Sequence, residues 1–262
     1  MRSGGLHTVC EEARCPNRSE CFSRGTATFL INGRICTRNC AYCSIAHGRP
    51  SPLDPREPQE LVHAAIEIGL EHVVITAVDR DDLQDGGASG FVDCVAALRK
   101  LDRPPTVEVL TPDFRGDLRA VDQIIDAGPE VYNHNVETVP RLYRQLRRSG
   151  RYQWALEVLG RVSERAPRML RKSGLMVGLG ETPDEIVEVL QNLRDVGCQV
   201  VTIGQYLRPT PRQVPVERYW APEEFEELEK TGGEIGLEVF AGPFVRSSYH
   251  AEEAFLKVVG QG

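Results

Sequence analysis

The chain has 262 residues, a formal net charge of −7 at pH 7, 41% hydrophobic residues and 26% charged residues. This length buries one substantial core of α/β-barrel size, and the negative charge argues against a nucleic-acid binder and against attraction to anionic membranes. No apolar run reaches the roughly 20 residues of a membrane span, and the polar start of the chain carries no secretory signal, so we expect a cytoplasmic protein.

Cysteine is concentrated at the start of the chain, where six of the eight cysteines fall between positions 10 and 43. They form two triplets: Cys10, Cys15 and Cys21, then Cys36, Cys40 and Cys43. A secreted disulfide scaffold distributes its cysteines along a shorter chain, whereas a compact cluster in a reducing compartment is typical of metal binding. The two triplets therefore predict two metal centres.

The second triplet follows the first predicted strand, 26–31, an apolar and β-branched run that ends at Asn32-Gly33. Its spacing is CxxxCxxC, and short spacings allow one loop to hold a [4Fe–4S] cluster through thiolates. Three protein ligands leave one of four irons open to a small-molecule chelator, as a catalytic zinc keeps one exchangeable position. A structural zinc site with His47 as fourth ligand is the alternative.

Beyond this motif, apolar runs alternate with amphipathic stretches. Helices are expected at 57–69, 89–100, 117–127, 151–165, 183–196 and 222–235, and further strands at 72–76, 106–110, 131–136, 170–177 and 199–204. Six strands that alternate with helices predict an α/β fold with a parallel sheet, as a partial (βα)6 barrel of TIM type. A doubly wound open sheet is the alternative. We expect the barrel over 26–208, between a cysteine-bearing segment over 1–25 and a C-terminal extension over 209–262.

Polar residues lie in or directly after several of these strands, and the functional groups of such barrels lie at the strands' C-terminal ends. Asp79 follows 72–76, Asn135 and Glu137 lie at the end of 131–136, and Lys172 lies in 170–177. Polar side chains at such positions fit hydrogen bonds to a bound cofactor. Solvated or helix-capping polar groups are the alternative.

The CxxxCxxC motif after the first strand of a barrel resembles the signature of the radical S-adenosylmethionine (SAM) superfamily, and Tyr42 matches an aromatic residue that is frequent there. The resemblance implies that Cys36, Cys40 and Cys43 hold a [4Fe–4S] cluster whose open iron binds the amino and carboxylate groups of SAM. It also implies that an electron from the cluster cleaves SAM to a 5′-deoxyadenosyl radical.

Other segments resemble the lipoyl synthase family, among them HTVCEEARCPN from His7, NHNVET from Asn133, KSGLMVGLGE from Lys172 and RSSYHA from Arg246. The resemblance implies an auxiliary [4Fe–4S] cluster on the first cysteine triplet, with a serine of RSSYHA as the fourth ligand, Ser248 being favoured over Ser247. A hard serine oxygen binds the iron of an iron–sulfur cluster less strongly than a soft thiolate does. Such a ligand suits a cluster that is taken apart as a sulfur donor.

The implied activity is that of a sulfurtransferase that inserts sulfur at C6 and C8 of a protein-bound octanoyl-lysine, with Cys36, Cys40, Cys43 and Ser248 as catalytic residues. The implied partners are an octanoylated lipoyl carrier domain or glycine cleavage H protein, a reductant such as ferredoxin or flavodoxin, and iron–sulfur assembly proteins, without nucleic acid or membrane. Family members usually have a longer stretch before the first triplet than the nine residues here. The alternatives are another radical SAM enzyme, such as a methylthiotransferase or a biotin-synthase-like enzyme, and a non-enzymatic iron–sulfur or zinc module.

Overall fold

The computed structural model describes residues 7–8, 26–248, 251 and 255. They contain one sheet with strands β1 (His7–Thr8), β2 (Thr26–Ile31), β3 (His72–Ala77), β4 (Thr106–Leu110), β5 (Val131–Asn133), β6 (Leu170–Val177), β7 (Val200–Gln205) and β8 (Glu238–Gly242). Strands β2 to β8 are parallel, and each pairs with the next in sequence, while β1 pairs antiparallel with β2. This sequential order confirms the partial barrel, because a doubly wound sheet reverses its strand order at a switch point.

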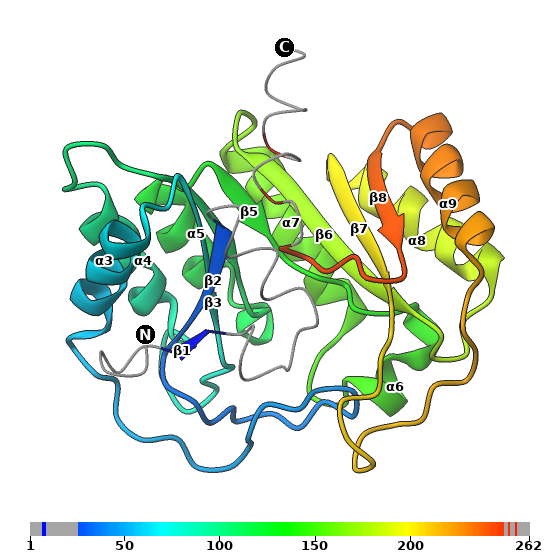
Figure 1. Ribbon diagram of the computed structural model, residues 1–262, viewed down its shortest axis with the longest axis horizontal. Coiled ribbons are helices and arrows are strands. Elements are labelled where there is room, and N and C mark those ends of the chain that lie inside the picture. The colour runs from blue at the N-terminus through cyan, green and yellow to red at the C-terminus, as the bar shows by residue number, and fades with distance from the viewer. Residues whose placement is uncertain (1–6, 9–25, 249–250, 252–254, 256–262) are drawn as a thin grey trace.

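Helices cover the outer face of the curved sheet (Figure 1). They are α3 (Glu57–Ile68), α4 (Ala88–Leu98), α5 (Leu118–Ala127), α6 (Tyr143–Leu146), α7 (Tyr152–Arg165), α8 (Pro183–Asp195) and α9 (Pro222–Ile235), with short 3-10 turns η2 (Phe114–Gly116) and η3 (Pro140–Leu142). In the part of the chain described, no helix is both long and apolar enough to cross a membrane. Because the helices pack against the outer side of the sheet, that side is apolar, and the inner side is left for polar groups.

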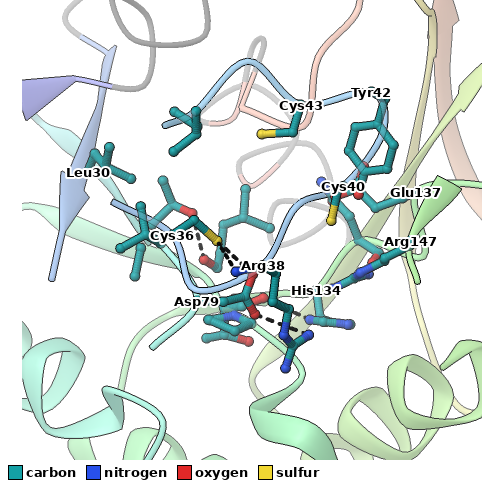
Figure 2. A pocket seen from close by; sticks show the side chains of 18 of the residues that line it. Leu30, Cys36, Arg38, Cys40, Tyr42, Cys43, Asp79, His134, Glu137 and Arg147 are labelled. Carbon is teal, nitrogen blue, oxygen red and sulfur yellow. Dashed lines mark hydrogen bonds and ion pairs between the residues drawn. The ribbon is translucent and has the colours of Figure 1, made fainter. Parts of the chain in front are cut away.

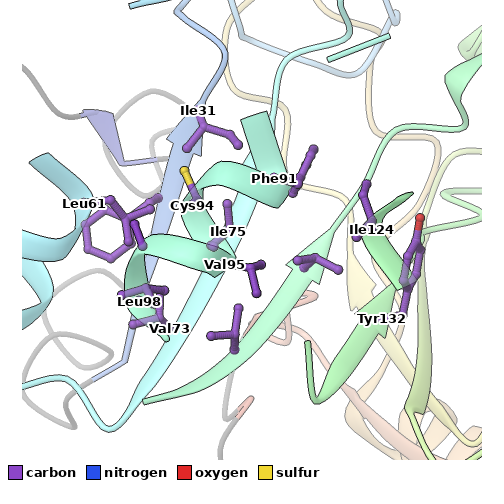
Figure 3. Close-up of a cluster of buried hydrophobic side chains, with 14 of the residues drawn as sticks. Ile31, Leu61, Val73, Ile75, Phe91, Cys94, Val95, Leu98, Ile124 and Tyr132 are labelled. Atoms are coloured by element: carbon purple, nitrogen blue, oxygen red, sulfur yellow. The ribbon is translucent and has the colours of Figure 1, made fainter. Parts of the chain in front are cut away.

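The alternation of side chains along each strand explains this division. Val73 and Ile75 of β3 face outward into an apolar core that includes Phe91 and Cys94 of α4 (Figure 3). A second apolar core packs β6 to β8 against α7, α8 and α9. Glu108 lies between Val107 and Val109 of β4, which belong to the first apolar core. Glu108 itself is fully buried but belongs to neither apolar core. Successive side chains of one strand thus point alternately to the apolar core and to the barrel interior.

Two features differ from the sequence-based expectation. The sheet continues past residue 208, because β8 adds a seventh parallel strand beside β7. The strand expected over 131–136 ends at Asn133. Beyond it, Glu137 has a left-handed backbone (φ 66°), which turns the chain inward at the end of the sheet.

Candidate active site

The CxxxCxxC loop begins five residues after β2 and is fixed by backbone hydrogen bonds. The amide of Cys36 donates to the carbonyl of Ala46 (2.8 Å), and Gly48 donates back to Cys36 (2.9 Å), which closes the loop on itself. Ala41 donates to the carbonyl of Leu146 at the end of α6 (2.8 Å) and accepts from Val214 in the segment after β7 (3.1 Å). The loop is therefore held between elements more than 100 residues away in sequence.

Cys36, Cys40 and Cys43 line one cavity of about 230 Å³ at the C-terminal ends of the strands. Figure 2 shows their sulfur atoms around the same open space. The remaining wall comes from the ends of β2, β3 and β4, the segment after β5, and the residue after α6. Its polar members include Asp79, Thr111, His134, Asn135, Glu137 and Arg147. The three predicted cysteines and three of the four predicted cofactor-binding residues thus share one cavity.

Burial governs the charge state of the three thiols. Burial, with a smaller contribution from the carboxylate of Asp79, raises the pKa of Cys36 to about 12, and burial raises the pKa of Cys43 to about 12. Burial also raises the pKa of Cys40. The raised pKa values favour the neutral form of all three thiols at pH 7. Because iron binds the thiolate, cluster loading releases protons and becomes more favourable as pH rises.

Arg38, inside the cysteine motif, anchors the loop to the ends of β3 and β4. Its guanidinium is buried and contacts Asp81 (2.8 Å), Asp113 (2.8 Å) and Asp79 (3.2 Å). The carboxylate of Asp79 lies 3.6 Å from Cys36 Sγ. Sequence reasoning missed Arg38 and Asp113. The available signal was an arginine within the cysteine motif together with the acidic VDRDD segment after β3.

The segment after β5 supplies the opposite wall. Arg147 Nη1 donates to the carbonyl of Asn135 (3.1 Å), and burial raises the pKa of Glu137 despite the charge of Arg147. His134 Nδ1 lies 2.8 Å from the carbonyl of Thr111, and burial lowers the pKa of His134 to about 4. A neutral His134 donates from Nδ1, so its Nε2 is an acceptor. Within the described residues Nε2 has no partner.

Lys172 lies outside the lining of this cavity. Its Nζ is 3.2 Å from both carboxylate oxygens of Glu108 inside the barrel, where Asn133 Nδ2 also donates to Glu108 (2.8 Å). Burial alone raises the pKa of Glu108, but the charge of Lys172 and the contact with His72 outweigh it, and the pKa falls to about 2. The structure thus places Lys172 in an internal ion pair.

The predicted auxiliary site is only partly described. Cys10, Cys15 and Cys21 lie outside the described residues. Ser247 and Ser248 are described and half-buried after β8. Ser247 Oγ accepts a hydrogen bond from Asn135 Nδ2 (2.7 Å), so the C-terminal segment reaches the wall of the cysteine cavity.

The donor set fits an iron–sulfur cluster with a small polar ligand. The three thiols line a shared space rather than converge on one point, which fits a polynuclear cluster better than a single ion. Nowhere in the described ranges do three His, Cys, Asp or Glu side chains group closely enough for one metal ion, and His47 is exposed. The guanidinium of Arg147, which lines the cavity, is suited to a carboxylate group of such a ligand.

Comparison with known proteins agrees with this chemistry. Residues 30–193 match the family model of the radical SAM superfamily. The lipoyl synthase of Klebsiella pneumoniae subsp. pneumoniae is 54% identical over 254 residues, which cover 96% of this chain and 79% of that protein. The lipoyl synthase of Thioalkalivibrio sulfidiphilus is 51% identical over 264 residues, which cover 100% of this chain and 82% of that protein.

Solved structures share the fold at low sequence identity. Methylornithine synthase has a TM-score of 0.60 at 13% identity, with 82% of this chain and 70% of that chain covered. Coproporphyrinogen III oxidase from Escherichia coli, described as a radical SAM enzyme, has a TM-score of 0.58 at 11% identity, with 80% and 53% covered. These likenesses support the barrel architecture.

Proposed function

Because this chain belongs to the lipoyl synthase family of radical SAM enzymes, we propose that it is a sulfurtransferase that inserts two sulfur atoms into a protein-bound octanoyl-lysine, at C6 and C8. The observation that carries the proposal is the cavity into which Cys36, Cys40 and Cys43 project beside buried polar strand ends. The target carbons have no neighbouring group that acidifies their hydrogens, so acid–base catalysis is ineffective there. A [4Fe–4S] cluster on the three cysteines supplies, with SAM, the radical hydrogen abstraction that they need.

The residues of the chain hold, orient and enclose these groups. Arg38 fixes the cysteine loop by its three carboxylate contacts, which keeps the thiols at the mouth of the barrel. Asp79, Asn135 and Glu137 are proposed to bind the polar groups of SAM, since all three line the cavity.

We further propose that Cys10, Cys15, Cys21 and Ser248 hold a second [4Fe–4S] cluster that donates the sulfur. The triplet spacing and the family membership support this assignment. Reconstituted protein should then contain about eight irons and eight sulfides per chain. A stable content of about four irons per chain, with both cysteine triplets intact, would contradict the proposal of a second cluster.

The proposed partners follow from the substrate and the electron requirement. They are an octanoylated lipoyl carrier domain or glycine cleavage H protein, a low-potential reductant such as ferredoxin or flavodoxin, and iron–sulfur assembly proteins. We propose a cytoplasmic location, because free thiols that bind metal persist in a reducing compartment.

The test is an anaerobic reaction of reconstituted protein with SAM, a reductant and an octanoyl-lysine peptide, read by mass spectrometry. We expect loss of the octanoyl peptide, a monothiolated intermediate, and a product that carries two sulfur atoms. A Cys36→Ala variant, reconstituted in parallel, should yield neither SAM cleavage nor product. SAM cleavage by the intact protein without sulfur in the peptide would contradict the proposed reaction and leave the radical SAM assignment in place.

A further inference from the structure

The hydrogen bond between Asn135 and Ser247 joins two parts of the chain that are 112 residues apart. Asn135 lines the cysteine cavity, whereas Ser247 belongs to the segment after β8. The Nδ2–Oγ distance of 2.7 Å is short for an amide donor, and both groups are at least half-buried. A contact of this kind links the cavity to the segment that also carries Ser248.

The inner face of the barrel is shaped to receive this segment. A Cβ atom at Gly204 of β7 would collide with the carbonyl oxygen of Val245, so only glycine admits the backbone there. A Cβ at Gly174 of β6 would lie 2.9 Å from Asn135 Oδ1 and 3.3 Å from Ser247 Oγ. Two glycines on neighbouring strands thus allow the segment to approach closely enough for Ser247 to reach Asn135.

The side chain of Asn135 also interacts with Glu137, which lines the cysteine cavity. The Asn135 amide partly offsets the effect of burial, which raises the pKa of Glu137. Asn135 Oδ1 is buried beside Gly174 and has no hydrogen-bond partner within the described residues. Glu137 is therefore the group that connects Asn135 to a ligand in the cavity.

We propose that Ser247 is a positioning residue that couples occupancy of the SAM cavity to the C-terminal segment, and that it acts through the side chain of Asn135. This inference rests on the proposed function, because it takes SAM as the occupant. A cationic group that engages Glu137 makes this carboxylate a weaker acceptor for the Asn135 amide, which leaves the amide a stronger donor to Ser247. By linkage, the bond to Ser247 strengthens SAM binding to the same extent.

The two neighbouring serines then have separate roles. The Ser247 hydroxyl is engaged by Asn135, whereas the Ser248 side chain makes no hydrogen bond within the described ranges. This difference favours Ser248 as the hydroxyl that is proposed to bind the auxiliary cluster. Ser247 fixes where that hydroxyl lies relative to the SAM cavity.

The first test measures the SAM dissociation constant of reconstituted protein by equilibrium binding. Ser247→Ala should raise it about three- to tenfold, because an Asn135 side chain released from Ser247 must be ordered again when SAM binds. Ser247→Thr keeps the hydroxyl and should stay within about twofold of the wild type, as should the control variant Arg56→Ala, whose exposed side chain lies outside the cavity lining. Equal SAM affinity in Ser247→Ala and the wild type overturns the inference alone. A wild-type protein that does not bind SAM overturns the proposed function and this inference together.

Two further readouts separate positioning from ligation. The Ser247→Ala variant should keep about eight irons per chain, and loss of the auxiliary irons would make Ser247 the ligand instead. In hydrogen–deuterium exchange, SAM should slow the amides of 243–248 in the wild type and in Ser247→Thr but not in Ser247→Ala. Equal protection by SAM in all three proteins would contradict the coupling.

Discussion

Two buried ion-pair clusters lie in the same barrel, and their surroundings differ. The mouth cluster consists of Arg38, Asp79, Asp81, Asp113 and Arg147, at the C-terminal ends of the strands. The interior cluster consists of Lys172, Glu108, Asn133 and His72, deeper in the barrel. Both bury charge, which is costly unless each charge has a partner.

The difference lies in what each cluster joins. The mouth cluster connects loops that follow β2, β3 and β4 and borders the cysteine cavity, with Asp79 within 3.6 Å of Cys36. The interior cluster connects residues of the strands themselves, and none of its members lines that cavity. Barrels of this type concentrate chemistry at the C-terminal face and stability below it. In this barrel, buried charged side chains therefore indicate the functional site only where they border a cavity.

The largest effect is expected from Arg38→Ala, which leaves several carboxylates near one another without their shared cation. Removal of one partner from a buried pair costs about 3–5 kcal/mol. We expect a large fall in the free energy of unfolding, measured in urea, and loss of iron from the Cys36 cluster. Arg56→Ala removes an exposed arginine paired with Asp54 and should change neither quantity. An Arg38→Ala protein with normal stability and iron content would show that the mouth cluster does not hold the loop.

Lys172→Met should destabilise the protein by about 3 kcal/mol, because the carboxylate of Glu108 stays buried without its cation. The double variant Lys172→Met with Glu108→Gln removes both charges and should regain most of that loss. Urea unfolding measures the recovery, and equilibrium binding measures SAM affinity. If the interior cluster is structural, the double variant binds SAM within about twofold of the wild type. A tenfold loss of SAM affinity in the double variant would instead support the prediction from the sequence that Lys172 binds the cofactor.

His134 should make stability depend on pH. Its pKa is about 4 in the folded protein and about 6.5 in an unfolded chain. Between these values the unfolded state binds a proton that the folded state does not, so stability falls as pH falls from 6.5 towards 4. The expected loss between pH 7.5 and pH 5 is about 2 kcal/mol. His134→Gln removes this difference, and an unchanged pH profile in that variant would show that His134 is not the buried neutral group.

The smallest effect concerns a helix far from both clusters. Thr182 caps α8 by accepting a hydrogen bond from the amide of Glu185 (3.3 Å), and the amide of Thr182 donates to the carboxylate of Glu185 (2.9 Å). Thr182→Ala should cost about 1 kcal/mol in thermal or urea unfolding. SAM affinity should be unchanged. A change in SAM affinity in this variant would mean that SAM binding depends on the overall stability of the barrel and not on the cavity residues alone.

The sequence pattern predicted most of the fold, because short apolar runs and amphipathic helices alternate clearly from Thr26 to Gln205. It missed β8, since Glu238–Gly242 is short and includes a glycine, and its parallel pairing depends on β7 rather than on local pattern. Spacing alone identified Cys36, Cys40 and Cys43, because a metal motif is local. Contacts that join distant segments, such as Asn135 with Ser247, leave no local signal and need the folded chain.

The central claim is that the cavity lined by Cys36, Cys40 and Cys43 holds a cluster that SAM contacts directly. The most direct test uses protein in which Cys10, Cys15 and Cys21 are all replaced by alanine, reconstituted anaerobically and reduced. Electron paramagnetic resonance then records the remaining cluster before and after SAM is added. We predict about four irons per chain and a spectrum that shifts with SAM. A variant that retains no cluster, or a cluster whose spectrum SAM leaves unchanged, would contradict the account.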